Sequence, residues 1–112
     1  MLNYKIFRPK EWQTLQAEGQ TLGAPIDHTD GFIHFSTATQ ASETAAKHFA
    51  GADGLWLAAS ESDDLGEKLV WEPSRGGLLF PHLYRALQLS EVIWCIPLPL
   101  VDGVHSFPAE MV

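Results

Sequence analysis

Residues 31–37 read GFIHFST, which places a histidine within an alternating apolar pattern and then adds two hydroxyl side chains. A two-residue period is typical of a β-strand, and it puts His34 and Ser36 on one face. The opposite face, formed by Ile33 and Phe35, is wholly apolar and is expected to face the core. We therefore expect His34 to point into a ligand cleft and to orient a ligand by hydrogen bonding. The alternative is a core histidine satisfied by a backbone carbonyl.

The surrounding sequence predicts an α+β fold with a substantial sheet. Apolar runs predict strands at residues 2–7, 32–36, 54–60, 67–73 and 90–98. Helices are predicted at residues 10–18 and 38–50, and Gly19 and Gly51 are expected to end them. Either Ser36 or Thr37 can cap the second helix.

Two segments do not fit this pattern of strands and helices. Residues 21–30, TLGAPIDHTD, are rich in turn-forming residues and are predicted as a connection. Residues 78–89 stay unassigned because Pro81 is unsuited to a central strand and to the interior of a helix. The predicted order is strand, helix, strand, helix, two strands, an irregular segment and a final strand.

The length of 112 residues is typical of one domain, which we place at residues 1–112 with a core at about 4–98 and a tail at 99–112. The sequence shows no signal-peptide pattern and no run of about eighteen apolar residues that could span a membrane. The single cysteine, Cys95, is predicted to be a buried, unreactive thiol. These features predict a cytoplasmic protein.

The charge of the chain limits its partners. Seven Lys and Arg against fourteen Asp and Glu give a formal net charge of -7, which disfavours nucleic acid and anionic membranes as partners. Lys5, Arg8 and Lys10 nevertheless gather positive charge near the N-terminus. A small-molecule ligand, including an anionic one, is therefore the expected partner.

A second polar segment, WEPSRGGLLFPHLY at residues 71–84, holds groups that an ordinary core does not need. They are an acid, a cation, an imidazole and a phenol: Glu72, Arg75, His82 and Tyr84. Rigid apolar side chains such as Phe80 flank them, as in a ligand pocket. Each residue alone also fits a surface role, such as an ion pair across the turn, but the set favours a site for a polar ligand.

Common metal-binding and catalytic motifs are absent from the sequence. The five histidines show none of the spacings H-x-H, H-x-x-x-H or H-E-x-x-H, so no metal site is predicted. The glycine-rich dinucleotide motif, the phosphate loop and the G-x-S-x-G motif are also missing. Their absence disfavours Rossmann-type binding, P-loop hydrolysis and esterase chemistry.

The segments DGFIHFSTATQ, LGEKLVWEPSRGG and LFPHLY resemble the domain-of-unknown-function 952 family of small, mostly bacterial, single-domain proteins. The resemblance covers roughly residues 4–98. This family is similar in fold to the ADP-ribosyltransferases, which hold NAD in a cleft between two small sheets. The resemblance therefore implies an ADP-ribosyltransferase-like split β-sheet with two or three short helices, and it makes NAD a possible cofactor.

The resemblance also implies roles for individual residues. His34, Ser36 and Thr37 would anchor the nicotinamide ribose, and Glu72 would stabilise an oxocarbenium-like ribosyl centre. Arg75 or the basic residues near the N-terminus could meet a pyrophosphate. The candidate catalytic residues are His34, Glu72 and His82, and the candidate ligand-binding residues are Ser36, Thr37, Arg75, Phe80 and Tyr84.

Three classes of function follow from these residues. The first is binding of a small nucleotide-like or other polar metabolite in a cleft built from IHFST and WEPSRGGLLFPHLY. The second is an ADP-ribosyl-transferring or NAD-cleaving enzyme, so the sequence leaves enzymatic activity open. The third is a protein-interaction domain whose surface is formed by exposed aromatic residues near His82.

Overall fold

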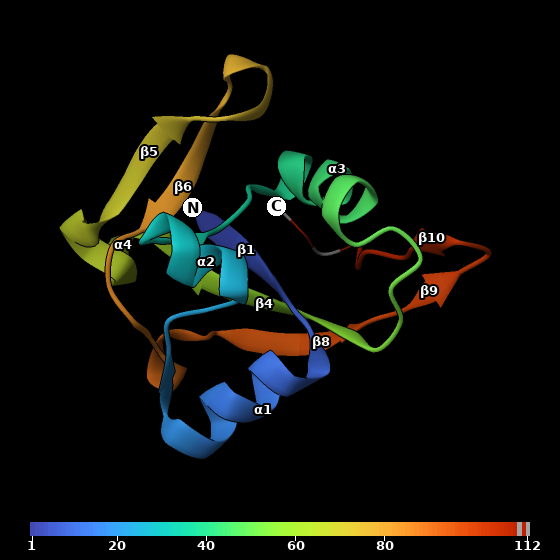
Figure 1. Ribbon diagram of the computed structural model, residues 1–112, viewed down its shortest axis with the longest axis horizontal. Helices are drawn as coiled ribbons and strands as arrows, with labels where there is room; N and C mark the ends of the chain where they lie inside the picture. The colour runs from blue at the N-terminus through green and yellow to red at the C-terminus, as the bar shows by residue number, and fades with distance from the viewer. Residues whose placement is uncertain (110, 112) are drawn as a thin grey trace.

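Two three-stranded antiparallel sheets lie at the centre of the part of the chain that the computed structural model describes, residues 1–109 and 111 without the side chain of Arg75 (Figure 1). One has the order β1-β4-β8 and comprises Leu2–Phe7, Leu55–Glu61 and Trp94–Leu98. The other has the order β3-β6-β5 and comprises Ile33–His34, Leu79–Leu83 and Leu69–Pro73. Shorter strands form two more pairs, which are β2 (Gln20–Thr21) with β7 (Leu87–Gln88), and β9 (Leu100–Val101) with β10 (Val104–His105).

The described residues contain four α-helices, which are α1 (Pro9–Glu18), α2 (Pro25–Asp30), α3 (Ala38–His48) and α4 (Ser62–Leu65). Three short 3-10 segments lie between other elements of the described chain: η1 (Gly66–Lys68), η2 (Arg75–Gly77) and η3 (Leu89–Glu91). The implied number of two or three helices is too low, because α2 forms in the segment predicted as a connection and the one-turn α4 follows β4. None of the described helices is long and apolar enough to cross a membrane.

A backbone bridge joins the two central sheets. Tyr4 on β1 and Ser36 just after β3 each donate an N–H to the carbonyl of the other, at 2.7 and 2.8 Å. From this junction the β5–β6 hairpin extends away from the β1-β4-β8 sheet (Figure 1). The chain between His34 and Ser36 therefore passes from one sheet to the edge of the other.

Apolar side chains cover both faces of the β1-β4-β8 sheet. One cluster packs α1 and the β3-β6-β5 sheet against it, and includes Phe7, Leu15, Ile33, Phe35 and Leu83. The other packs α3 against the opposite face, and includes Tyr4, Ile6, Ala45 and Leu57. Ile33 and Phe35 are 1% and 2% exposed, so the predicted apolar face of residues 31–37 does face the core.

The predicted ends of the two longer helices are nearly right. Helix α1 begins at Pro9, one residue before the predicted start, and Gly19 ends it with a left-handed φ of 77°. Helix α3 begins after Thr37, whose side chain accepts the Gln40 N–H at 3.3 Å. It ends at His48, with Phe49 as the C-cap, so the predicted end at residue 50 and the stop at Gly51 are wrong.

The prediction of a mere connection at residues 21–30 is wrong, because this segment contains part of β2 and the whole of α2. Pro25 occupies the first turn of α2, where its missing N–H costs no helical hydrogen bond. The Asp27 carboxylate accepts the Ala24 N–H at 2.8 Å, and Gly31 ends the helix with a φ of 83°. Side-chain capping and a terminal glycine thus make a short helix from a turn-rich sequence.

The expectation that Pro81 excludes a central strand is also wrong. Pro81 lies in β6, between β5 and β3, and pairs with Trp71 on β5. Its carbonyl accepts the Phe35 N–H at 3.0 Å, just beyond the last residue of β3. The missing proline N–H is tolerated because the β3–β6 ladder ends at this residue pair.

The C-terminal segment is closely packed against the rest of the protein. Phe107 and Met111 contact the cluster beneath α3, and the His105 Nε2–H donates to the Ala52 carbonyl at 2.7 Å. Residues Glu110 and Val112 of the predicted tail lie outside the described residues.

Trp94 and Cys95 on β8 are half-buried. The Trp94 ring lies 5.8 Å from the Tyr4 ring, measured between centroids. Burial raises the pKa of the Cys95 thiol to about 12, which keeps the thiol protonated at neutral pH. This environment is consistent with the prediction of an unreactive thiol, but Cys95 is half-buried rather than buried.

Core burial gives a direct test of the fold. Phe7→Ala should lower the free energy of unfolding by about 3–5 kcal/mol, because the Phe7 side chain is fully buried. Trp94→Ala should lower it by less, about 1–3 kcal/mol, because part of the indole already meets water. Urea unfolding at pH 7 measures both values, and equal losses would contradict this assignment of the core.

Candidate functional site

Four aromatic rings gather on the face of the β3-β6-β5 sheet that is turned away from the core. His34 on β3 lies directly opposite His82 on β6, and their ring centroids are 5.4 Å apart in an edge-on arrangement. The Phe32 ring stacks on His82 at 4.1 Å and contacts His34 at 4.6 Å and Tyr84 at 5.1 Å. The antiparallel register thus brings together residues from IHFST and FPHLY that are 48 positions apart.

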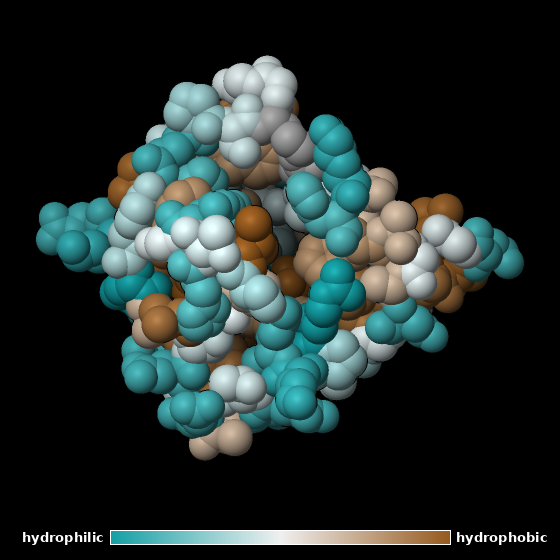
Figure 2. Space-filling view, in the orientation of Figure 1, coloured by the Kyte–Doolittle hydropathy of each residue, from teal (hydrophilic) through white to brown (hydrophobic). Residues whose placement is uncertain are grey.

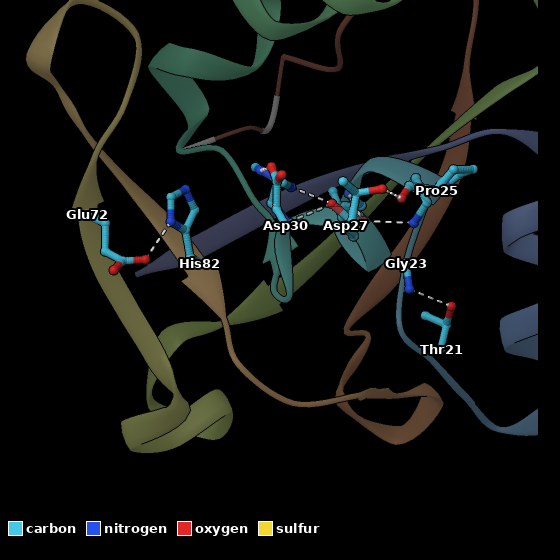
Figure 3. Close-up of polar contacts among 11 residues, drawn as sticks. Thr21, Gly23, Pro25, Asp27, Asp30, Glu72 and His82 are labelled. Carbon is cyan, nitrogen blue, oxygen red and sulfur yellow. Dashed lines mark hydrogen bonds and ion pairs between the residues drawn. The ribbon is translucent and has the colours of Figure 1, made fainter.

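Glu72 on β5 holds the imidazole of His82 in place (Figure 3). The His82 Nδ1–H donates to Glu72 Oε1 at 2.8 Å, and the Tyr84 hydroxyl donates to the same oxygen at 2.6 Å. The hydrogen bonds from Tyr84 and His82 lower the pKa of Glu72, and the bond to Glu72 raises the pKa of Tyr84. An ionised Glu72 can only accept, so the neutral form of His82 carries its proton on Nδ1 and has Nε2 as an acceptor.

The imidazole of His34 lies between two carboxylates of α2. Its Nδ1–H donates to Asp27 Oδ1 at 2.5 Å, and its Nε2 is 3.0 Å from Asp30 Oδ2. The backbone N–H of His34 also donates to Asp27 Oδ1, at 3.1 Å. Both ring contacts are favourable together only when both nitrogens carry hydrogen.

Asp27 is the buried centre of this arrangement. Its side chain is inaccessible to solvent, and Oδ2 accepts the Lys5 ammonium and the Ala24 N–H, each at 2.8 Å. Burial alone raises the pKa of Asp27, but the hydrogen bond from His34 and the charge and hydrogen bond of Lys5 outweigh burial. They lower the pKa from its usual 3.8 to about 2. Asp27 is therefore ionised and fixes Lys5, α2 and His34 relative to one another.

These groups border a cleft of about 620 Å³ beside the junction of the two sheets. Figure 2 shows that the surface is hollowed between α2 and α3, with hydrophobic side chains exposed at the rim. The polar and charged residues that line the cleft are Lys5, Arg8, Glu11, Asp27, Asp30, His34, Ser36, Thr44, His48, Ser74 and His82. Its apolar walls include Tyr4, Ile6, Phe35, Phe49 and Phe80.

The structure places the predicted site residues in three groups. His34, Ser36, Phe80 and His82 line the cleft. Glu72 and Tyr84 do not line the cleft. Glu72 contacts His82 directly, and Tyr84 donates to the same Glu72 oxygen.

Thr37 has a capping role at the start of α3, where its N–H also donates to Gln40 Oε1 at 3.0 Å. Arg75 belongs to η2 in the β5–β6 loop, and its side chain lies outside the described part of the chain.

Sequence reasoning missed Asp27 and Asp30 because it assigned their segment to a connection. The signal was present, since Pro25 and Gly31 are typical first and terminal residues of a helix, but six residues are too few for an apolar period. His48 was not singled out either, because nothing near it in the sequence suggests a site. Among the described residues, no group of three or more His, Cys, Asp or Glu side chains could hold a metal ion.

Comparison with known proteins gives the family. The model of a family of proteins of unknown function, DUF952, matches residues 6–95, and the chain belongs to this family. No curated protein matches the sequence.

Two solved structures of one bacterial protein are similar to the whole chain. The crystal structure of protein CC0527 from Caulobacter crescentus is 50% identical over 95% of this chain and 94% of that chain, with a TM-score of 0.91. The solution NMR structure of CC0527 is 52% identical over 92% of this chain and 90% of that chain, with a TM-score of 0.82. CC0527 therefore shares the α+β fold described above.

The buried charge of Asp27 predicts a specific acid sensitivity. Because the pKa of Asp27 is about 2 in the folded protein and its usual value is 3.8, the carboxylate stabilises the fold fully above about pH 4. This contribution, about 2 kcal/mol, is lost as the pH falls from about 4 to 2. Asp27→Asn should remove this part of the pH dependence and cost about 3–5 kcal/mol at pH 7, because it leaves the Lys5 ammonium buried without a carboxylate.

Urea unfolding at pH 7, 4 and 2.5 measures the effect, and Asp64→Asn provides the control because Asp64 is exposed on α4. An Asp27→Asn protein that loses stability between pH 4 and 2.5 as steeply as the wild type would contradict the role of this carboxylate.

Proposed function

We propose that the protein binds a small polar metabolite that carries an oxyanion, such as a nucleotide-like phosphate compound, in the cleft beside the sheet junction. The observation that carries the proposal is the gathering of cationic and imidazole side chains at one place. Two of the seven Lys and Arg and three of the five histidines line the cleft, together with three carboxylates. A guanidinium and imidazole N–H groups are donors that an oxyanion can accept.

Arg8 is the cation best suited to contact such a ligand. Its guanidinium carbon lies 4.8 Å from the centroid of the Phe49 ring, and both residues line the cleft. Lys5, in contrast, is already paired with the buried Asp27. A guanidinium presents a planar fork of donors that can bind a phosphate or carboxylate through two hydrogen bonds.

The size and walls of the cleft suit a small organic ligand. Its volume of about 620 Å³ lies within the usual range of small-molecule sites, roughly 300–1,000 Å³. The Phe49 ring is half-buried and offers contact area for a flat ring system, whereas Tyr4, Phe35 and Phe80 are almost fully buried. The combination of aromatic walls and basic side chains supports a nucleotide-like ligand.

An ADP-ribosyl-transferring or NAD-cleaving enzyme is the second candidate, supported by the Glu72–His82 pair and by the ADP-ribosyltransferase-like fold that the resemblance implies. An imidazole whose Nδ1 is held by a carboxylate is oriented for acid–base catalysis at Nε2. Glu72 does not line the cleft, so it would act as a positioning residue through His82. The third candidate, a protein-interaction domain, is supported by the exposed apolar residues Val70, Leu78 and Leu79 on β5 and β6 and the turn between them.

The binding proposal is tested with a panel of phosphate, pyrophosphate, nucleotides, NAD and ADP-ribose, by thermal shift and calorimetry. A ligand that binds only the folded protein raises the unfolding temperature by mass action. Arg8→Gln should weaken binding of the anionic ligands by about tenfold, which corresponds to one charge-assisted contact of about 1.4 kcal/mol. Lys47→Gln is the matched control, because Lys47 is exposed on α3 outside the cleft.

Equal losses in the Arg8 and Lys47 variants would place the anion outside the cleft. Failure of the whole panel to bind would contradict the proposal and favour the protein-interaction candidate.

Incubation with NAD separates the binding protein from the enzyme. We expect no release of nicotinamide, because the proposed role requires only binding. Chromatography of the products measures the release. If nicotinamide appears with the wild type and not with Glu72→Gln, the second candidate replaces our proposal.

A further inference from the structure

The two carboxylates that contact His34 differ in their surroundings. Asp27 is fully buried and holds Nδ1, whereas the Asp30 side chain is 38% exposed and lies 3.0 Å from Nε2 at the C-terminal end of α2. Asp27 is also tied to Lys5 and to the backbone of α2. The contact at Nδ1 is therefore part of the folded core, and the contact at Nε2 lies at the solvent boundary of the cleft.

The Asp30–His34 contact is weak enough to be exchanged. Ion pairs between partly exposed side chains contribute little to stability, because water screens them and ordering the side chains costs entropy. Asp30 has no second anchor among the hydrogen bonds of the described residues other than those of its own helix. An oxyanion from outside can therefore replace its carboxylate on His34 at small cost.

We propose that Nε2 of His34 is an oxyanion subsite and that the Asp30 carboxylate occupies it in the ligand-free protein. A carboxylate or phosphate group of the ligand displaces Asp30 and takes the place of its carboxylate beside Nε2. This inference rests on the proposed function, because it concerns the same cleft, and it assigns the group that the ligand must carry. A neutral ligand cannot replace the negative charge that the Asp30 carboxylate places beside this nitrogen.

The fixed Nδ1 contact supports this assignment. While Asp27 is ionised it accepts from Nδ1, so the ring keeps its orientation when Asp30 leaves. Nε2 then stays directed into a cleft that both His34 and Asp30 line. Asp30 thus imitates the ligand and competes with it.

The test compares the wild type, Asp30→Asn and Glu11→Gln in their affinity for inorganic phosphate and for succinate, by calorimetry. Glu11 is the matched control, because it also lines the cleft but accepts the Arg8 N–H at 2.9 Å in the cap of α1 and has no contact with His34 among the described ones. Asp30→Asn should tighten binding of both anions by about two- to fivefold, the size expected from removal of an exposed ion pair that competes with the ligand. Glu11→Gln should change it less.

A second measurement follows the His34 ring nitrogens by ¹⁵N NMR. Phosphate should shift the Nε2 signal of His34 in the wild type and leave its Nδ1 signal unchanged, because Asp27 stays bound. A response at His82 with none at His34 would overturn the inference.

The outcomes separate this inference from the function on which it rests. Equal gains in Asp30→Asn and Glu11→Gln would show a general charge effect and overturn the displacement. Wild-type binding without any gain in Asp30→Asn would overturn it too, and would leave the proposed function standing. Absence of binding by all three proteins would refute both.

Discussion

The buried carboxylate of Asp27 is the interaction on which the arrangement of the cleft depends. It joins β1 through Lys5, α2 through the Ala24 N–H, and β3 through both the backbone and the ring of His34. Removing a carboxylate from water is costly, and here one ammonium, one imidazole and two backbone N–H groups offset that cost. Because these partners come from three separate segments, their positions are fixed together along the side of the cleft that Lys5, Asp27 and His34 line.

The second constraint is the transfer of the chain between sheets at residues 33–36. Ile33 and His34 pair with β6, Phe35 still donates to Pro81, and Ser36 pairs with Tyr4 on β1. Because the same segment pairs first with one sheet and then with the other, the two sheets cannot lie flat against each other. The side chains on its outward face, His34 and Ser36, therefore lie in the cleft that borders the junction.

Alternation within one strand could be predicted from the sequence, and pairing between distant segments could not. The two-residue period correctly separated Ile33 and Phe35, which are 1% and 2% exposed, from His34, whose side chain is 33% exposed. It could not show that Lys5 and Asp27, 22 positions apart, form an ion pair. That contact depends on the path of the intervening chain, which a single sequence does not specify.

The same limit explains two of the wrong assignments of secondary structure. Helix α2 is too short for periodicity and is stabilised by the contacts of Asp27 rather than by propensity. Pro81 is unsuited to a strand only where both neighbouring strands continue past it, and β3 ends there. For both segments the deciding interaction is tertiary, so local sequence preference gave the wrong result.

The two histidines of the cleft, His34 and His82, differ in the burial of the carboxylate that holds Nδ1. Both have Nδ1 on a carboxylate, but Asp27 is buried and coupled to Lys5, whereas the Glu72 side chain is 36% exposed and bonded to Tyr84. The first pair stabilises the fold, since breaking it leaves a buried charge. The second adds little to stability because water screens it, yet it fixes a nearly buried imidazole beside the cleft. The pair therefore fixes the orientation of the His82 ring, and in the proposed function it leaves Nε2 as the nitrogen that meets a ligand.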